Sequence, residues 1–274
     1  MDMRIGADTE APEEGRKMAG QRRRRRRRRQ AVRARLLLFA LLIGAVFGFL
    51  RFKESRERKA FAMEGIEALE QGDYENAIAS FDRALLKSRG KTGSFEKEVL
   101  LYRAEAEYQK GDYAAALDTY ERLLAGDGKN EAYRTGAALC LAESGDYERA
   151  LELGSVPAYV YNRMAKSQIE AGEYEKASES VEAGLEAASS AGAEGMDDKE
   201  KAKKAKKRGG AFPSEEITDR AVRDLEYNRA VIAEFQGDYK KALALFEAYS
   251  AAHGTNERVE REIAFLRTRQ GSKE

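Results

Sequence analysis

The stretch GDYENAIASF, residues 72–81, carries the pattern that decides the fold. Its opening tripeptide of glycine, an acidic residue and tyrosine returns at positions 111, 145, 172 and 237. Each copy follows a segment of about 14 residues with helical periodicity and precedes a second amphipathic segment. Glycine can adopt the left-handed conformation that ends one helix, and the acidic residue favours the positive N-terminal end of the next. With the tyrosine packed between the two helices, the pattern predicts five helix–turn–helix units.

This pattern resembles the tetratricopeptide repeat family over about residues 60–189 and 217–254. The resemblance implies a small residue where paired helices come closest, namely Gly65, Ala104, Ala138, Ala165 and Ala230. It implies a second small residue in the following helix, namely Ala77, Ala116, Ala150, Ala177 and Ala242, with a bulky residue four positions later at Phe81, Tyr120, Val181 and Phe246. We therefore expect a solenoid of stacked helix pairs.

The repeats depart from the family in two places. The third repeat is about two helical turns short, so that its second helix should stop near Leu153 and Pro157 should open the next helix. Between the fourth and fifth repeats lies a lysine-rich, low-complexity segment that cannot bury a core, and it is predicted to be a linker. Residues 255–270 are predicted to form a closing helix over the last apolar face.

The N-terminal region differs from the repeats in composition. Eight arginines, Arg22–Arg29, precede fifteen unbroken apolar residues, Leu36–Leu50. This apolar run is short for a bilayer, but flanking arginines can extend it by placing their stems in the bilayer and their charges at its interface. A cleaved signal peptide is the alternative, although no clear small-x-small cleavage site follows the run. We expect an uncleaved transmembrane anchor over residues 36–52.

Charge sets the expected orientation of this anchor. Thirteen Lys or Arg residues precede Leu36, against five between Arg51 and Lys59. Basic flanks stay in the cytoplasm, so the N-terminus should remain inside the cell membrane while the repeats lie on the exported side. The arginine run should then rest on anionic lipid headgroups. No aromatic residue is interleaved with it to stack on bases, so nucleic acid is not the expected partner.

These observations predict an all-α protein, a helix-turn-helix repeat solenoid of about five repeats and a closing helix, preceded by one transmembrane helix. The expected divisions are an Arg-rich tail at 1–35, the transmembrane helix at 36–52, repeats one to four at 53–189, the linker at 190–216, and repeat five with the closing helix at 217–274.

Composition argues against catalysis. The chain has one cysteine, Cys140, and one histidine, His253, so neither an internal disulfide nor a histidine-based zinc cluster is possible. Cys140 lies in the apolar run AALCLA and is predicted to be a buried small hydrophobe. No phosphate-binding loop, dinucleotide glycine pattern or nucleophile elbow is present. No enzyme activity, cofactor or metal is expected.

The family resemblance implies a scaffold whose first helices line a groove for a peptide or partner helix. The candidate groove residues are Arg103, Asn162, Arg163, Asn228 and Arg229. The favoured function is a single-pass, membrane-anchored scaffold of the bacterial cell envelope that binds a protein or peptide partner. Two alternatives remain at this stage: a cytosol-facing organelle receptor for precursor proteins, and a nucleic-acid adaptor that uses the Arg-rich tail.

Overall fold

The structure is a computed structural model that describes residues 43–45, 47–49, 52–88, 93–194 and 213–271. The chain divides into two compact units, Met1–Glu57 and Arg58–Glu274. In the first unit, residues 43–45, 47–49 and 52–57 are helical. The predicted Arg-rich tail, most of the predicted membrane segment 36–52 and residues 195–212 of the predicted linker lie outside the described residues. Within the described ranges, none of the helices combines the length and apolar character needed to span a bilayer.

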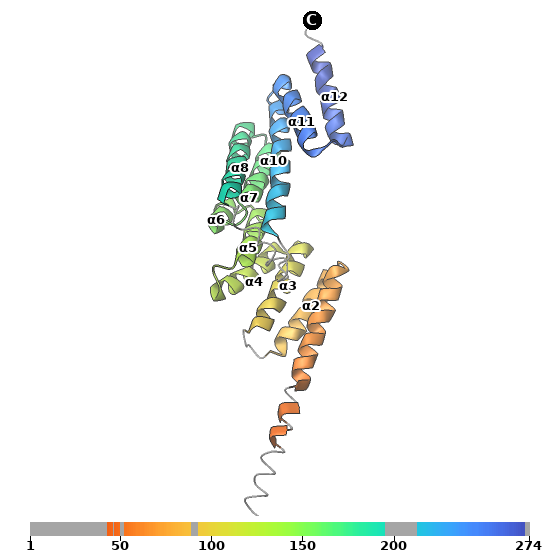
Figure 1. Cartoon of the computed structure of the whole chain (residues 1–274), viewed down its shortest axis with the longest axis vertical. Helices are drawn as coiled ribbons and strands as arrows, with labels where there is room; N and C mark the ends of the chain where they lie inside the picture. Colours follow the sequence, from red (N-terminus) through yellow and green to blue (C-terminus); the bar gives the residue numbers. More distant parts are fainter. Residues whose placement is uncertain (1–42, 46, 50–51, 89–92, 195–212, 272–274) are drawn as a thin grey trace, which may run out of the picture. The chain divides into compact units, whose positions relative to one another are not determined.

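The larger unit is an all-helical solenoid, and its helices follow one another in sequence order (Figure 1). Its described residues form helices and no strands. After a first helix that runs to residue 70, the helices are α2 (Tyr74–Leu86), α3 (Ser94–Lys110), α4 (Tyr113–Gly126), α5 (Glu131–Glu143), α6 (Tyr147–Leu153), α7 (Pro157–Glu170), α8 (Tyr174–Glu194), α10 (Ser214–Phe235), α11 (Tyr239–His253) and α12 (Glu257–Gly271). Five helix pairs and a final helix result, as the repeat pattern predicts.

The repeated tripeptide forms the joint within each pair. Its five glycines have φ between 74° and 85°, the left-handed region that ends the first helix. The aspartates do more than complement the helix dipole. Asp73, Asp112, Asp146 and Asp238 are N-caps whose carboxylates accept a hydrogen bond from the backbone N–H three residues later. One tripeptide therefore stops a helix and starts the next.

The positions that the family resemblance implies are buried in all five pairs. The alanines expected at the helix crossings are at most 1% exposed, and the bulky partners Phe81, Tyr120, Val181 and Phe246 are fully buried. A Cβ on Gly65 would lie only 2.5 Å from a ring carbon of Phe81, so this glycine has no room for a side chain. The structure adds Gly136, where a Cβ would lie 2.2 Å from the Tyr120 ring. Small residues therefore allow the helices to approach closely.

The shortened third repeat does not interrupt the stack. As expected, α6 has only seven residues and ends at Gly154, with φ 63°, and Pro157 opens α7. Because α6 is short, α7 packs against both α5 and α6. The array continues through a direct contact between the first helices of repeats three and four.

The last repeat begins earlier than predicted. Helix α10 starts at Ser214, inside the segment assigned to the linker, and its 22 residues contact α7, α8 and α11. Because the first turns of α10 pack on earlier helices, they are ordered although their composition is polar. The predicted closing helix is confirmed as α12, which buries Val259 and Leu266 against the end of the stack.

Candidate functional site

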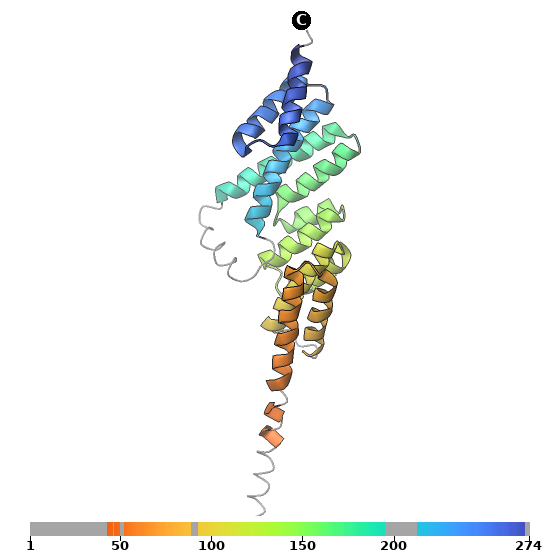
Figure 2. The ribbon, with the colours of Figure 1, turned by 90° about the vertical axis from the view of Figure 1, so that its right-hand side faces the viewer.

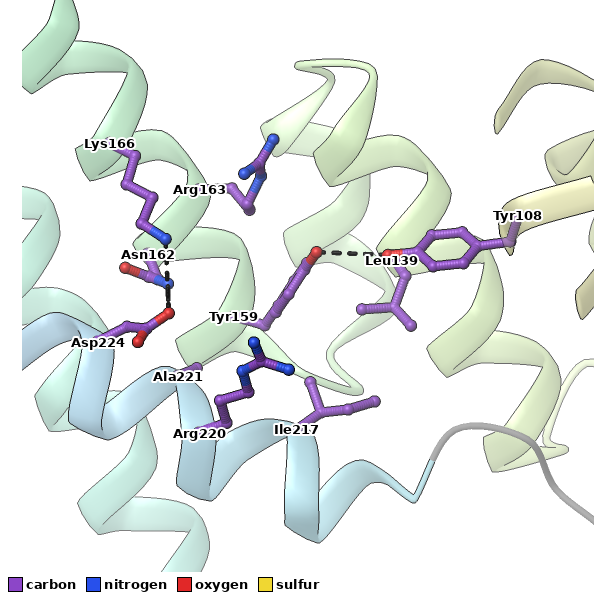
Figure 3. A pocket seen from close by; sticks show the side chains of 10 residues that line it. All are labelled: Tyr108, Leu139, Tyr159, Asn162, Arg163, Lys166, Ile217, Arg220, Ala221 and Asp224. Atoms are coloured by element: carbon purple, nitrogen blue, oxygen red, sulfur yellow. Dashed lines mark hydrogen bonds and ion pairs between the residues drawn. The ribbon is translucent and has the colours of Figure 1, made fainter. Parts of the chain in front are cut away.

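A pocket of about 320 Å³ lies among the first helices of repeats two to five. Figure 3 shows side chains from α3, α5, α7 and α10 around it. Its lining consists of Tyr108, Leu139, Tyr159, Asn162, Arg163, Lys166, Ile217, Arg220, Ala221 and Asp224. We call this the inner pocket. The lining residues run from Tyr108 to Asp224, so the pocket joins helices that are more than a hundred residues apart in the sequence. The short third repeat and the long α10 bring these helices together.

A tyrosine–carboxylate network forms one side of the inner pocket. The Tyr159 hydroxyl donates to the Glu143 carboxylate on α5 and lies 3.4 Å from the Tyr108 hydroxyl on α3. Burial, followed by the hydrogen bond to Glu143, raises the pKa of Tyr159, and burial raises the pKa of Tyr108 to about 12. Both phenols therefore stay neutral near pH 7. Arg163 Nη2 pairs with the other Glu143 oxygen at 2.8 Å, which fixes the guanidinium at the pocket wall.

An amide–carboxylate network forms the other side. Asn228 Nδ2 donates to Asn162 Oδ1 at 2.9 Å, and Asn162 Nδ2 donates to Asp224 Oδ2 at 3.3 Å. Lys166 Nζ lies 3.5 Å from the same Asp224 oxygen. Asn162 and Asn228 are 2% and 7% exposed, so both amides are part of the interface between α7 and α10. Asn228, a predicted groove residue, bonds to Asn162 and is absent from the pocket lining.

The remaining lining side chains give the pocket its charge and its apolar surface. Among the lining residues, Arg163, Lys166 and Arg220 are cations and Asp224 is a carboxylate. Glu143 pairs with Arg163 and Asp224 pairs with Lys166, so the unbalanced charge is that of Arg220. Arg220 is exposed, and within the described part of the chain it has no ion pair. Leu139 and Ile217 add aliphatic surface (Figure 3). The pocket is thus amphipathic with an excess of positive charge.

Two of the sequence candidates lie away from the inner pocket. Arg103 connects repeats one and two: its guanidinium bonds Asp82 on α2 at 2.8 Å, Glu107 on its own helix at 2.6 Å, and Thr119 on α4 at 3.0 Å. Arg229 Nε lies 2.8 Å from Glu182 on α8. The structure brings Asn162 and Arg163 to the pocket, and it places Arg103 and Arg229 in ion pairs between helices.

Most residues of the inner pocket are not among those predicted from the sequence. Lys166 was the most accessible to sequence reasoning, because it follows Asn162 by four residues and so shares its helix face. Tyr159 precedes Asn162 by three residues and therefore lies on the same helix face. In contrast, Tyr108 and Ile217 are brought to the pocket by the packing of distant helices, and no local pattern marks them.

The described residues contain no group of three or more His, Cys, Asp or Glu side chains arranged to hold a metal ion. Cys140 is fully buried in the core of repeats two and three, as expected. Burial raises the pKa of its thiol to about 12, so the thiolate that nucleophilic chemistry needs is not formed near neutral pH. The inner pocket offers hydrogen bonds, charge and apolar contact, which are the means of binding.

Comparisons with known proteins agree with the repeat pattern. Residues 62–132 match the family model described as tetratricopeptide repeat. No curated protein matches the chain significantly. Similar solved structures include a tetratricopeptide repeat protein from Parabacteroides merdae, with 15% identity over 79% of this chain and 74% of that chain and a TM-score of 0.48. Two others are MamA of MSR-1, with 16% identity, coverage of 78% and 98% and a TM-score of 0.41, and the TPR domain of P58(IPK), with 16% identity, coverage of 82% and 69% and a TM-score of 0.35.

Proposed function

We propose that this chain, whose residues 62–132 match the tetratricopeptide repeat family, is a scaffold that binds an acidic segment of a partner protein in its inner pocket. The observation that carries the proposal is the convergence of Arg163, Lys166 and Arg220 around one amphipathic pocket. Repeat solenoids present extended surfaces of this kind for binding.

The geometry favours a partner with one acidic group beside an aliphatic side chain. Arg220 lies exposed at the rim, where it can pair with a carboxylate that remains partly hydrated. Leu139 supplies a surface that an aliphatic side chain can cover. A volume of about 320 Å³ is at the lower end of ligand pockets, so the pocket accommodates one or two side chains. Further affinity would come from the surrounding first helices.

We further propose that the scaffold is anchored in a bacterial cell membrane by residues 36–52, with the repeats on the exported side and a role in the assembly of envelope complexes. The support is the uninterrupted apolar run Leu36–Leu50 together with the excess of basic residues before it. The acidic excess after Lys59, 41 acidic against 31 basic residues, is compatible with export of the repeats. Arg22–Arg29 would bind anionic headgroups on the cytoplasmic face.

The binding proposal is tested with the full chain and an array of short synthetic peptides that pair leucine with glutamate, alongside copies that carry glutamine. Glutamate peptides should bind more tightly than their glutamine copies. The double variant Lys166→Ala, Arg220→Ala should lose about tenfold or more in affinity, since two charge-assisted contacts are removed. Arg223→Ala is the matched control, because Arg223 is exposed on α10 and does not line the pocket. Equal binding of glutamate and glutamine peptides would contradict the proposal.

The topology proposal is tested by protease treatment of intact spheroplasts that contain the chain with a tag at residue 1. The repeats should be digested while the tag is spared. Protection of the repeats would rule out the exported orientation. Full release of the chain by carbonate extraction would rule out the anchor itself.

A further inference from the structure

Helix α10 is longer than α3, α5 and α7, the first helices of repeats two to four. It has 22 residues, whereas α3, α5 and α7 have 17, 13 and 14. The additional turns lie at its N-terminus and reach back over earlier repeats (Figure 2). There, Ser214 Oγ donates to Glu131 on α5 at 2.7 Å. The N-terminal end of α10, a helix of repeat five, therefore contacts repeat three.

Side chains of α10 already contact the pocket groups that, in the proposed function, bind a partner. Ile217 packs against the buried cluster of Ala138, Leu139 and Val156, of which Leu139 lines the inner pocket. Further along the same helix, the Asp224 carboxylate accepts a hydrogen bond from the Asn162 amide and pairs with the Lys166 ammonium group. Figure 3 shows Ile217 and Asp224 on the same helix, facing the side chains of α5 and α7. An aliphatic side chain and a carboxylate are thus already in place.

We propose that the first turn of α10, Ser214–Ile217, and the Asp224 carboxylate are internal occupants of the inner pocket, which an acidic partner segment must displace to reach Leu139 and Lys166. The inference rests on the proposed function. Asp224 neutralises Lys166 and occupies Asn162, so an incoming carboxylate competes with it for the same donors. The first turn of α10 is also acidic, with Glu215 and Glu216 beside Ile217, so the chain carries the chemistry expected of its own ligand.

Few interactions hold the first turn of α10 in place, so its opening should cost only a moderate amount of free energy. Its N-cap is Pro213, which makes no side-chain cap hydrogen bond, so the first N–H groups of α10 lack the cap that aspartate supplies to α2, α4, α6 and α11. Ile217 is only partly buried, in contrast to Leu225 further along the same helix, which is fully buried. Opening can therefore stop before Ala221, which is 2% exposed and shares a buried cluster with Leu225, and leave the repeat core intact.

Hydrogen exchange on the full chain tests whether the inner pocket holds the first turn of α10. In the unmodified protein, amides in residues 217–221 should be protected. Ile217→Ser should raise their exchange rates by about tenfold or more, while residues 225–235 stay within about twofold. Thr218→Ala, the adjacent uncharged control, should leave both regions unchanged. Absence of protection in the unmodified protein, or equal exchange in both variants, would overturn the inference.

Binding of the leucine–glutamate peptides tests whether the first turn of α10 restricts access. When only the open form binds, the apparent affinity scales with its population, so Ile217→Ser should tighten binding by about the same factor as it speeds exchange. Asp224→Asn should also tighten binding, by about threefold or more, because Lys166 is freed. Asp219→Asn removes the same charge from an exposed position of α10 and should have no such effect.

The outcomes separate this inference from the proposed function. Faster exchange in Ile217→Ser without tighter binding would overturn the role of the first turn of α10 as a competitor, while peptide binding to the unmodified chain would still support the proposed function. Failure of the glutamate peptides to bind any of the proteins would overturn the proposed function and, with it, the competitive role, even if exchange shows that the first turn of α10 is held.

Discussion

At the scale of single residues, Asn228 shows how burial changes the role of a side chain. It is 7% exposed and donates to Asn162 Oδ1 at 2.9 Å. Asn228→Ala would leave that oxygen without its donor in a site from which water is largely excluded. We predict a loss of about 1–3 kcal/mol in the free energy of unfolding, measured by urea denaturation.

Gln109→Ala provides the control for this prediction. Gln109 is exposed on α3, and its replacement should change stability by less than about 0.5 kcal/mol. If Asn228→Ala were as stable as the control, the amide pair would contribute nothing to the junction between α7 and α10.

Glu105 makes stability dependent on pH. Burial raises the pKa of its carboxyl from 4.5 to about 7, so the folded state binds a proton more tightly than the unfolded state. The stabilisation from this group is present below about pH 4.5 and is lost as the pH rises through about 7. Glu105→Gln remains uncharged throughout and should reduce the fall in unfolding free energy between those pH values by about 1 kcal/mol, after allowance for partial exposure.

Urea unfolding at a series of pH values measures this effect. Glu98→Gln, an exposed carboxyl on the same helix, should leave the pH dependence unchanged. Parallel pH profiles for Glu105→Gln and the unmodified chain would show that Glu105 is charged in the folded protein at neutral pH.

At the scale of the helix, the aspartate of the repeated tripeptide has a capping role that can be tested separately from its charge. Asp112 caps α4 by accepting from the Ala115 N–H at 3.2 Å. Asp112→Ala should cost about 1 kcal/mol in thermal or chemical denaturation, as loss of an N-cap usually does. Asp118→Ala removes an exposed aspartate from the same helix and should cost less than about 0.5 kcal/mol. A similar cost for both variants would indicate that the charge, rather than the cap, matters.

The helices were predictable where each repeat carries its own signals. Gly111 and Asp112 mark the joint in sequence, and the periodic alanines mark the crossing face, so the helix pairs and the early end of α6 followed from local chemistry. The start of α10 at Ser214 did not, because the contacts that order its first turns are made by Glu131 and Leu139, more than seventy residues earlier. A polar segment next to a low-complexity linker gives no local sign of such contacts.

The inner pocket is likewise predictable from the sequence only in part. Asn162 and Arg163 were found because they lie on a first helix that faces inward. Arg103 lies on an equivalent helix, but Asp82 and Glu107 bind its guanidinium in the structure. Whether a charged side chain binds a partner or a neighbouring helix depends on residues that sequence spacing alone does not bring together.

At the scale of the whole molecule, the unit Arg58–Glu274 contains a continuous series of apolar clusters, from Ala62 in the first repeat to Leu266 in α12. A fragment with these bounds should therefore be soluble, mostly helical and cooperative in thermal unfolding, as judged by circular dichroism and size-exclusion chromatography. A fragment that also lacks α12, ending at Gly254, should be less soluble, because the apolar face of α11 loses its cover. An aggregated parent fragment would contradict the autonomy of this unit.

The neutral amide pair between α7 and α10 has a consequence for the behaviour of the array in salt. Ion pairs such as Arg103–Asp82 and Arg163–Glu143 connect the earlier repeats, and mobile ions weaken such pairs where they are exposed. The Asn162–Asn228 bond carries no net charge and is buried, so added electrolyte leaves it largely unaffected. As ionic strength rises, the ion-paired contact between repeats one and two should therefore loosen before the amide contact between α7 and α10. Within the inner pocket, electrolyte would weaken the ion pairs of Arg163 and Lys166 and so free their charges, while the amide pair keeps the two helices together.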